Sequence, residues 1–240
     1  MELIRDAVNA VQKNLDALGI YVGIMLVAST TATYANSWMA VPAENPYADP
    51  NLIAYEVALN LFLVFSAAIA QSIAFARLGK NIDRPLWKIS GDLEAIKLYL
   101  PLWAGLNAIV ILVQALTTWS VATFGGSGVS GVLFILMVLA VIVYIPVGAA
   151  LMFLRTPDWT HLPEAVRPLF RQFSKTLVIL AMTGLLFLLQ ISLISGMEGQ
   201  PWLRPLVDIA FAYFDCVIFS AVWLLSMYDR QAPEEVDLDF

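Results

Sequence analysis

Three carboxyl groups lie within long apolar stretches of this sequence: Glu56, Asp208 and Asp215. An ionisable group at the centre of a lipid bilayer costs about 2.5–3.5 kcal/mol on insertion scales, so such residues are the first place to look for a functional site. Asp208 and Asp215 are seven residues apart and therefore share one helix face, about 10 Å apart along the axis. That separation is too large for the two carboxyls to share one proton.

Polar amides follow similar spacings on two other apolar stretches. Asn60 lies four residues after Glu56, on the same helix face. Asn107 and Gln114 repeat the seven-residue spacing, and Gln190 lies on a further apolar stretch. If these faces converge, they form a polar patch in the outer half of the membrane. The candidate site residues are Asp215, Asp208, Glu56, Asn60, Asn107 and Gln114.

Asp215 is the centre of this predicted site. It lies about eleven residues into its stretch, near the bilayer midplane at a rise of about 1.5 Å per residue. No Lys or Arg lies at that depth. The carboxyl has to be protonated, hydrated, hydrogen-bonded to a group such as Asn107 or Tyr213, or paired with another molecule. Two interpretations stay open: a cation or proton site, or interhelical hydrogen bonds worth about 1 kcal/mol each or less.

Other chemistries lack the residues they need. The single cysteine, Cys216, lies in a hydrophobic run, and the single histidine, His161, has no ligand-type neighbour at metal spacing. We therefore expect no catalytic residue, no metal site and no cofactor, and hence a protein that is not an enzyme. The 13 Lys and Arg residues are scattered over short loops, which argues against a nucleic-acid partner.

The elements that position these residues follow from composition. The chain has 240 residues, of which 60% are hydrophobic and 13% charged, and its mean hydropathy is +0.78. Soluble domains are about 45–50% apolar and about 25% charged. The excess lies in six blocks, each long enough to cross a bilayer. We predict an all-α membrane domain (1–228) with spans at about 17–35, 52–76, 96–122, 132–155, 174–195 and 205–227, a Gly/Ser loop at 125–131, and an acidic tail at 229–240.

Basic residues predict the orientation. Twelve of the 13 Lys and Arg residues lie before the first span, after the last, or in the two loops on that same side; Arg204 is the exception. Cytoplasmic loops are enriched in Lys and Arg, so both termini are expected in the cytoplasm. Residues 2–16 have apolar side chains at helical spacing with charges opposite, which predicts an amphipathic helix at the cytoplasmic interface.

The two cytoplasmic loops are similar to each other. One is RPLWKISGDLEAIKLYLPLW (84–103) and the other RPLFRQFSKTLVIL (167–180), and each leads into a span. Proline is tolerated in the first turn of a helix, so an interfacial helix can begin at each Arg-Pro-Leu. If residues 2–16 form the first such helix, the chain consists of three parallel repeats, each an interfacial helix followed by a helical hairpin. Alternatively, Arg-Pro-Leu only anchors a span at the surface.

The segments FARLGKNIDRPLWK (75–88) and LFRQFSK (169–175), together with the N-terminal interfacial helix, carry a resemblance. The layout resembles bacterial six-span membrane proteins of the YciC-like kind and the membrane domain of some glycerophosphoryl diester phosphodiesterases. This resemblance implies a bacterial plasma (inner) membrane location and no defined activity. The chain has no phosphodiesterase catalytic domain, so no enzyme activity is implied.

Two function classes follow. The first is an accessory, assembly or scaffold component of a membrane complex, with the lipid bilayer and other membrane subunits as partners; a homo-oligomer is compatible with it. The alternative is a small transporter of a cation, a proton or an amphipathic solute, including lipid, that uses the polar patch around Asp215. Transporters often have broken helices. Pro101 and Pro146 lie within spans, and Pro146 is the better candidate for a break.

Overall fold

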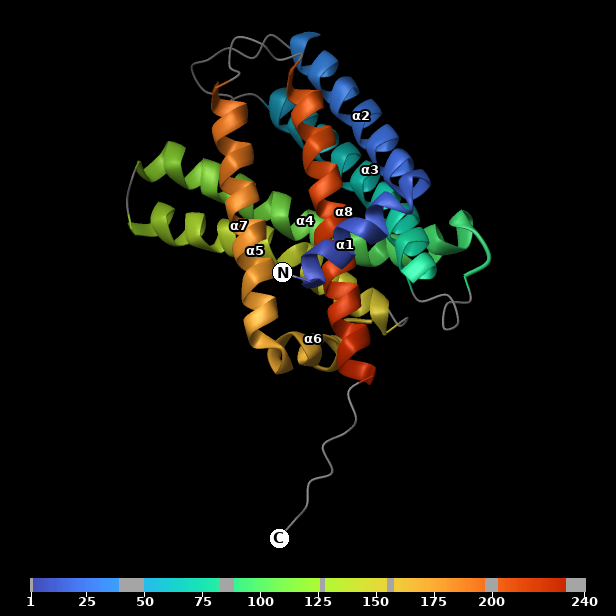
Figure 1. Ribbon diagram of the computed structural model, residues 1–240. Coiled ribbons are helices and arrows are strands. Elements are labelled where there is room, and N and C mark those ends of the chain that lie inside the picture. Colours follow the sequence, from blue (N-terminus) through green and yellow to red (C-terminus); the bar gives the residue numbers. More distant parts are fainter. Residues whose placement is uncertain are drawn as a thin grey trace.

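The computed structural model describes residues 2–38, 50–82, 89–125, 128–154, 158–196 and 203–231. Within these ranges the chain forms eight α-helices and a short 3₁₀ helix at Trp159–His161, with no strand (Figure 1). The α-helices are α1 (Glu2–Gln12), α2 (Leu15–Trp38), α3 (Pro50–Ile82), α4 (Asp92–Phe124), α5 (Gly128–Phe153), α6 (Leu162–Arg171), α7 (Phe173–Gly196) and α8 (Arg204–Gln231).

Six of these helices are long and apolar enough to cross a membrane: α2, α3, α4, α5, α7 and α8. The predicted all-α fold with six spanning helices is therefore confirmed. The helices extend beyond most of the predicted limits, because polar residues at their ends continue the helix. Much of the predicted Gly/Ser loop is helical, since α5 begins at Gly128. Gly125 ends α4 with a φ of +62°, a conformation that glycine adopts readily.

Helix α8 is the central element of the bundle. It contacts α1, α2, α3, α5, α6 and α7. In the most apolar 18-residue segment of α8, 61% of the residues are buried inside the protein. The corresponding share is 11–22% in the other five long helices. Figure 1 shows α8 between α7 and α2, with α1 lying across it. The sixth span therefore has protein neighbours on most sides, whereas the other five have large surfaces left for lipid.

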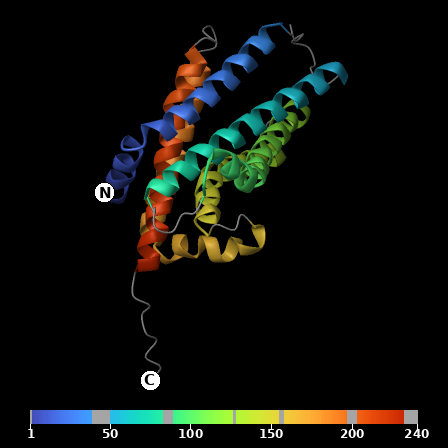
Figure 2. The same cartoon turned by 90° about the vertical axis from the view of Figure 1, so that its right-hand side faces the viewer.

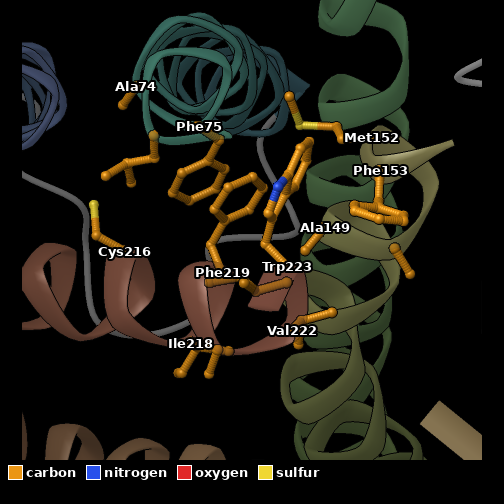
Figure 3. Packing of buried hydrophobic residues seen from close by; sticks show 14 of the residues in the cluster. Ala74, Phe75, Ala149, Met152, Phe153, Cys216, Ile218, Phe219, Val222 and Trp223 are labelled. Carbon is orange, nitrogen blue, oxygen red and sulfur yellow. The ribbon is translucent and has the colours of Figure 1, made fainter. Parts of the chain in front are cut away.

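An aromatic layer, formed by Phe75, Trp103, Phe153, Phe219 and Trp223, lies between the halves of α3, α4, α5 and α8 that are nearer to α6. The rings of Phe75 and Phe219 stack with centroids 4.4 Å apart, and Phe153 meets Trp223 edge-on at 5.2 Å (Figure 3). Trp103 packs edge-on against Phe75 at 5.0 Å. Aromatic pairs in these geometries stabilise a core by about 0.5–1.5 kcal/mol each beyond their burial. This layer fixes the four helices together at one end of the bundle.

The contact between α4 and α5 depends on a glycine. A methyl group at Gly148 of α5 would overlap the indole ring of Trp103. The indole is fully buried, and its Nε1–H donates to the sulfur of Met152 at 3.2 Å. The absence of a side chain at Gly148 therefore lets α4 and α5 approach closely through the tryptophan.

An ionic clamp joins three helices at the same end. The guanidinium of Arg77 on α3 donates two hydrogen bonds to Asp92 at the start of α4, at 2.9 and 2.6 Å. It donates a third, at 3.3 Å, to Asp16 of α2. Asn81 of α3 also donates to Asn14, which lies in the turn between α1 and α2. Side chains that carry charge thus hold α2, α3 and α4 in register outside their apolar segments.

The N-terminal helix differs from its prediction. It ends at Gln12, a turn follows, and Leu15 already belongs to α2. Its apolar side chains Leu3, Ala7 and Val11 are buried, and the helix packs against α8. The amphipathic pattern predicted a helix, and the helix is present. However, its buried apolar residues are covered by protein rather than by lipid.

The structure contains only part of the predicted repeat of interfacial helices and hairpins. Helix α6 lies across the lower end of the bundle and leads into α7, as α1 leads into α2 (Figure 2). However, Pro168 lies in the interior of α6, and the proline of its first turn is Pro163. The prediction that Arg-Pro-Leu begins the helix is wrong there. The corresponding segment 84–88 lies outside the described residues.

Two further expectations are corrected. Helices α4 and α5 continue through Pro101 and Pro146, so the predicted break at Pro146 is absent from α5. Helix α8 reaches Gln231, which places Asp229 in the helix, where its carboxylate lies 3.7 Å from Arg171. The rest of the predicted acidic tail, 232–240, lies outside the described residues.

Candidate functional site

A cleft of about 390 Å³ lies between the six long helices, on the side of the aromatic layer away from α6. All six contribute to its walls, from Tyr21 and Asn36 on α2 to Asp208 and Asp215 on α8. Its polar lining residues are Tyr21, Ser29, Thr33, Asn36, Gln71, Asn107, Gln114, Tyr144, Thr183, Gln190, Asp208 and Asp215. Its apolar lining residues include Met25, Leu59, Leu63, Val110, Ile111, Val141, Phe187 and Phe211.

Asp215 and Tyr21 form the floor of the cleft. The phenolic hydroxyl of Tyr21 donates a hydrogen bond to Oδ2 of Asp215 at 2.9 Å. Tyr21 is almost completely buried, and its ring contacts Phe75 at 5.4 Å, so the aromatic layer holds the hydroxyl in place. Asp215 is partly exposed to the cleft. A carboxylate accepts about four hydrogen bonds, so one phenol leaves it capacity for a ligand.

Asp208 lies two turns nearer to the start of α8. Ser29 of α2 donates a hydrogen bond to its Oδ2 at 2.6 Å. Two hydroxyl groups of α2 thus meet two carboxyls of α8, and these contacts tie the helices together along the cleft. Each hydrogen bond within a membrane contributes about 1 kcal/mol or less, so the pairs position the acids more than they stabilise the bundle.

A buried pair of amides closes the wall between α3 and α4. Nδ2 of Asn107 donates to Oε1 of Gln71 at 2.7 Å, and both side chains are buried. Of the alternatives for Asp215, the structure shows a hydrogen bond from a hydroxyl. The donor is Tyr21 and not Asn107, which pairs with Gln71. Both residues belong to the lining of the cleft.

Four of the six predicted site residues line the cleft: Asp215, Asp208, Asn107 and Gln114. Glu56 and Asn60 are not among its lining residues. At that level of α3 the residue that faces the cleft is Leu59. Asn60 is the next residue, so it points about 100° away. Glu56 lies one turn nearer to the start of α3 and is exposed.

Sequence reasoning did not single out seven polar residues of the cleft: Tyr21, Ser29, Thr33, Asn36, Gln71, Tyr144 and Thr183. Gln71 interrupts an apolar stretch and could have been found by the rule that selected Asn107. Ser29 was not conspicuous, because hydroxyls in a membrane helix commonly bond to their own backbone. Tyr21 and Tyr144 could not be distinguished from ordinary aromatic core residues. Their roles depend on which helices are neighbours, and this follows from the three-dimensional packing.

The cleft has an excess of negative groups. Among the described residues that line it, two are aspartates and none is Lys, Arg or His. Nor do the described residues contain a group of three or more His, Cys, Asp or Glu side chains placed to hold a metal ion. The geometry therefore provides an acidic, partly apolar binding space inside a membrane protein, without a metal centre in the described part of the chain.

The six long apolar helices and the cleft between them define the class of this chain: it is a polytopic α-helical integral membrane protein. Comparison of the chain with protein-family models, with curated proteins and with solved structures finds no match.

Proposed function

We propose that this protein is not an enzyme and that it transports a small amphipathic solute by way of the cleft. The observation that supports the proposal is the cleft itself, which reaches the carboxyl of Asp215 near the middle of α8 and has both polar and apolar walls. Its volume of about 390 Å³ falls within the range of about 300–1,000 Å³ that is usual for ligand pockets. Interhelical hydrogen bonds alone do not require such a space.

We further propose that both termini lie in the cytoplasm and that the cleft opens toward the outer side of a bacterial plasma membrane. The distribution of Lys and Arg supports the orientation. The resemblance of the layout to bacterial six-span proteins supports the location. In this orientation the aromatic layer around Phe75 separates the cleft from the cytoplasm, and transport requires these helices to part.

A bulky side chain placed in the cleft tests the proposed transport. Thr33 of α2 lines the cleft, whereas Thr31 is exposed on another face of the same helix. We expect Thr33→Trp to reduce solute uptake into proteoliposomes at least tenfold, while Thr31→Trp leaves uptake unchanged. A panel of radiolabelled amphipathic amines, alcohols and carboxylates identifies a transported solute first, against empty liposomes. Equal uptake by the two variants, or no uptake of any solute, would contradict the proposal.

An accessory role in a membrane complex is the second candidate, and Glu56 favours it. This carboxyl is exposed on α3, with the exposed side chains of Ile53 and Val57 beside it. A charged group on an apolar helix surface is suited to a basic residue of another subunit. Purification from native membranes in mild detergent, followed by mass spectrometry, tests this role. A stoichiometric partner lost in Glu56→Gln would support it.

A further inference from the structure

We infer that the ligand of the cleft is a small amphipathic amine, with its ammonium group at Asp215 and its apolar part along the walls of α3, α4 and α7. This inference rests on the proposed function and names the chemical class of the solute. The contacts of the two acids, the shape of the cleft and the distribution of its apolar residues carry it.

The charge of the cleft favours a cationic ligand. Asp215 and Asp208 face a cleft in which no described lining residue is basic. Each receives a side-chain hydrogen bond from α2, from Tyr21 and Ser29 respectively. Neutral hydroxyls orient a carboxylate but do not neutralise it. A ligand that brings a positive charge removes the cost of an unpaired acid in the membrane, whereas an anion would add to it.

The two acids are too far apart to bind one calcium or magnesium ion together. Calcium takes six to eight oxygen ligands, and magnesium requires near-octahedral oxygen coordination. Asp208 and Asp215 are seven residues apart on α8, about 10 Å along its axis, so they cannot hold one ion together. A single ammonium group needs one carboxylate and a few further acceptors. Asp215 supplies the carboxylate, and Asn107 and Gln71 line the same cleft.

The apolar walls of the cleft favour a ligand with an apolar part. Leu63 of α3, Val110 and Ile111 of α4, and Phe187 of α7 line the space beside the acids. A proton or a hydrated inorganic cation gains nothing from these side chains. An alkyl or aryl group gains about 25 cal/mol for each Å² of apolar surface that it buries. The combination of one acid at the floor with apolar walls therefore selects a molecule that has both a cationic and an apolar end.

Asp208 has a different role from Asp215. It lies nearer to the start of α8, where Ser29 holds it at the wall of the cleft. An incoming amine meets this acid before the one at the floor. Asp208 therefore raises the local concentration of cations, and Asp215 binds the ammonium group.

The experiment measures binding rather than transport. Phenethylammonium chloride is titrated into the purified protein in dodecyl maltoside, and 2-phenylethanol serves as a neutral molecule of nearly the same shape. We expect the amine to bind at least tenfold more tightly than the alcohol. Asp215→Asn should weaken amine binding at least tenfold and Asp208→Asn about threefold, while alcohol binding stays unchanged in both. Glu56→Gln is the matched control and should leave amine binding unchanged.

An ethanolamine phospholipid offers the same ammonium chemistry as a free amine. Native mass spectrometry of the purified protein, with phosphatidylethanolamine or phosphatidylglycerol added, distinguishes the two sources. Retention of phosphatidylethanolamine that Asp215→Asn abolishes, and that competes with phenethylammonium, would identify the lipid headgroup as the ligand. Binding of phenethylammonium without such competition would identify a free amine.

Three results would overturn the inference: equal affinity for the amine and the alcohol, amine binding that Asp215→Asn leaves intact, or no binding of either amine source. Circular dichroism of each variant shows whether it is folded, and alcohol binding by Asp215→Asn shows that its cleft is intact. Failure of the inference is distinguishable from failure of the proposed function. Uptake of a neutral solute that Thr33→Trp blocks would retain the transport proposal and reject the amine.

Discussion

The hydroxyl of Tyr21 on α2 lies 2.9 Å from Oδ2 of Asp215 on α8 and donates a hydrogen bond to it. The two residues are far apart in the sequence, and the contact joins the first and last membrane helices. The ring of Tyr21 also rests against Phe75 of the aromatic layer. The acid at the floor of the cleft is therefore oriented by a group that the core itself holds rigidly.

We expect Tyr21→Phe to lower the free energy of unfolding by about 1 kcal/mol, the usual net contribution of one hydrogen bond. The substitution removes only the hydroxyl and keeps the ring contact with Phe75. Thermal unfolding in detergent, followed by circular dichroism, measures the change. Tyr34→Phe is the control, because Tyr34 is exposed on the same helix. Equal stability of the two variants would show that the Tyr21 hydroxyl is unimportant for the fold.

Gly148→Ala should be strongly destabilising. The new methyl group would overlap the indole of Trp103, which is fully buried and cannot move aside without displacing Phe75. Overpacking of this kind costs about 1–3 kcal/mol. Gly131→Ala, in the same helix, meets nothing within 4 Å and should be neutral or slightly stabilising, since alanine favours a helix by about 1 kcal/mol over glycine. Melting temperatures of the two variants measured side by side test the contact.

The sequence predicted the fold well because the bilayer imposes a strong pattern. Each long apolar block had to be a helix, and the structure contains all six of them. Helix ends were less well predicted, since Gly128 and Asp229 belong to helices although their sequences suggest a loop and a tail. Polar residues near a membrane surface are compatible with a helix or with a loop. Packing against neighbouring helices determines which of the two forms.

Only some of the residues that line the cleft could be identified from the sequence, for a related reason. A carboxyl such as Asp215 is conspicuous in an apolar stretch, and so it was found. Which helices would face it could not be derived, because every spanning helix has apolar residues on all sides. Tyr21 and Tyr144 were therefore not recognised as cleft residues. Glu56 was named as a candidate although it does not line the cleft.

Arg77→Lys should destabilise the bundle by roughly 1 kcal/mol. The guanidinium makes a two-pronged contact with Asp92 and a third hydrogen bond to Asp16, and a lysine ammonium cannot reproduce that fork. Because Arg77 is about one-third exposed, solvent screens the pair and keeps the effect small. High salt should narrow the difference between the variant and the parent protein in thermal unfolding. A loss of stability that does not respond to salt would assign the effect to packing instead.

The proposed orientation predicts a labelling pattern. In a Cys216→Ser background, single cysteines replace Trp38 at the end of α2, Lys13 before α2, and Gln231 at the end of α8; all three positions are exposed. A membrane-impermeant maleimide applied to intact cells should label position 38 and should reach positions 13 and 231 only after permeabilisation. The basic residues near positions 13 and 231 favour the cytoplasm, and the large interfacial tryptophan suits the outer surface. The reverse pattern would place the cleft on the cytoplasmic side. Labelling of positions 13 and 231 from opposite sides would show that the number of membrane crossings is odd.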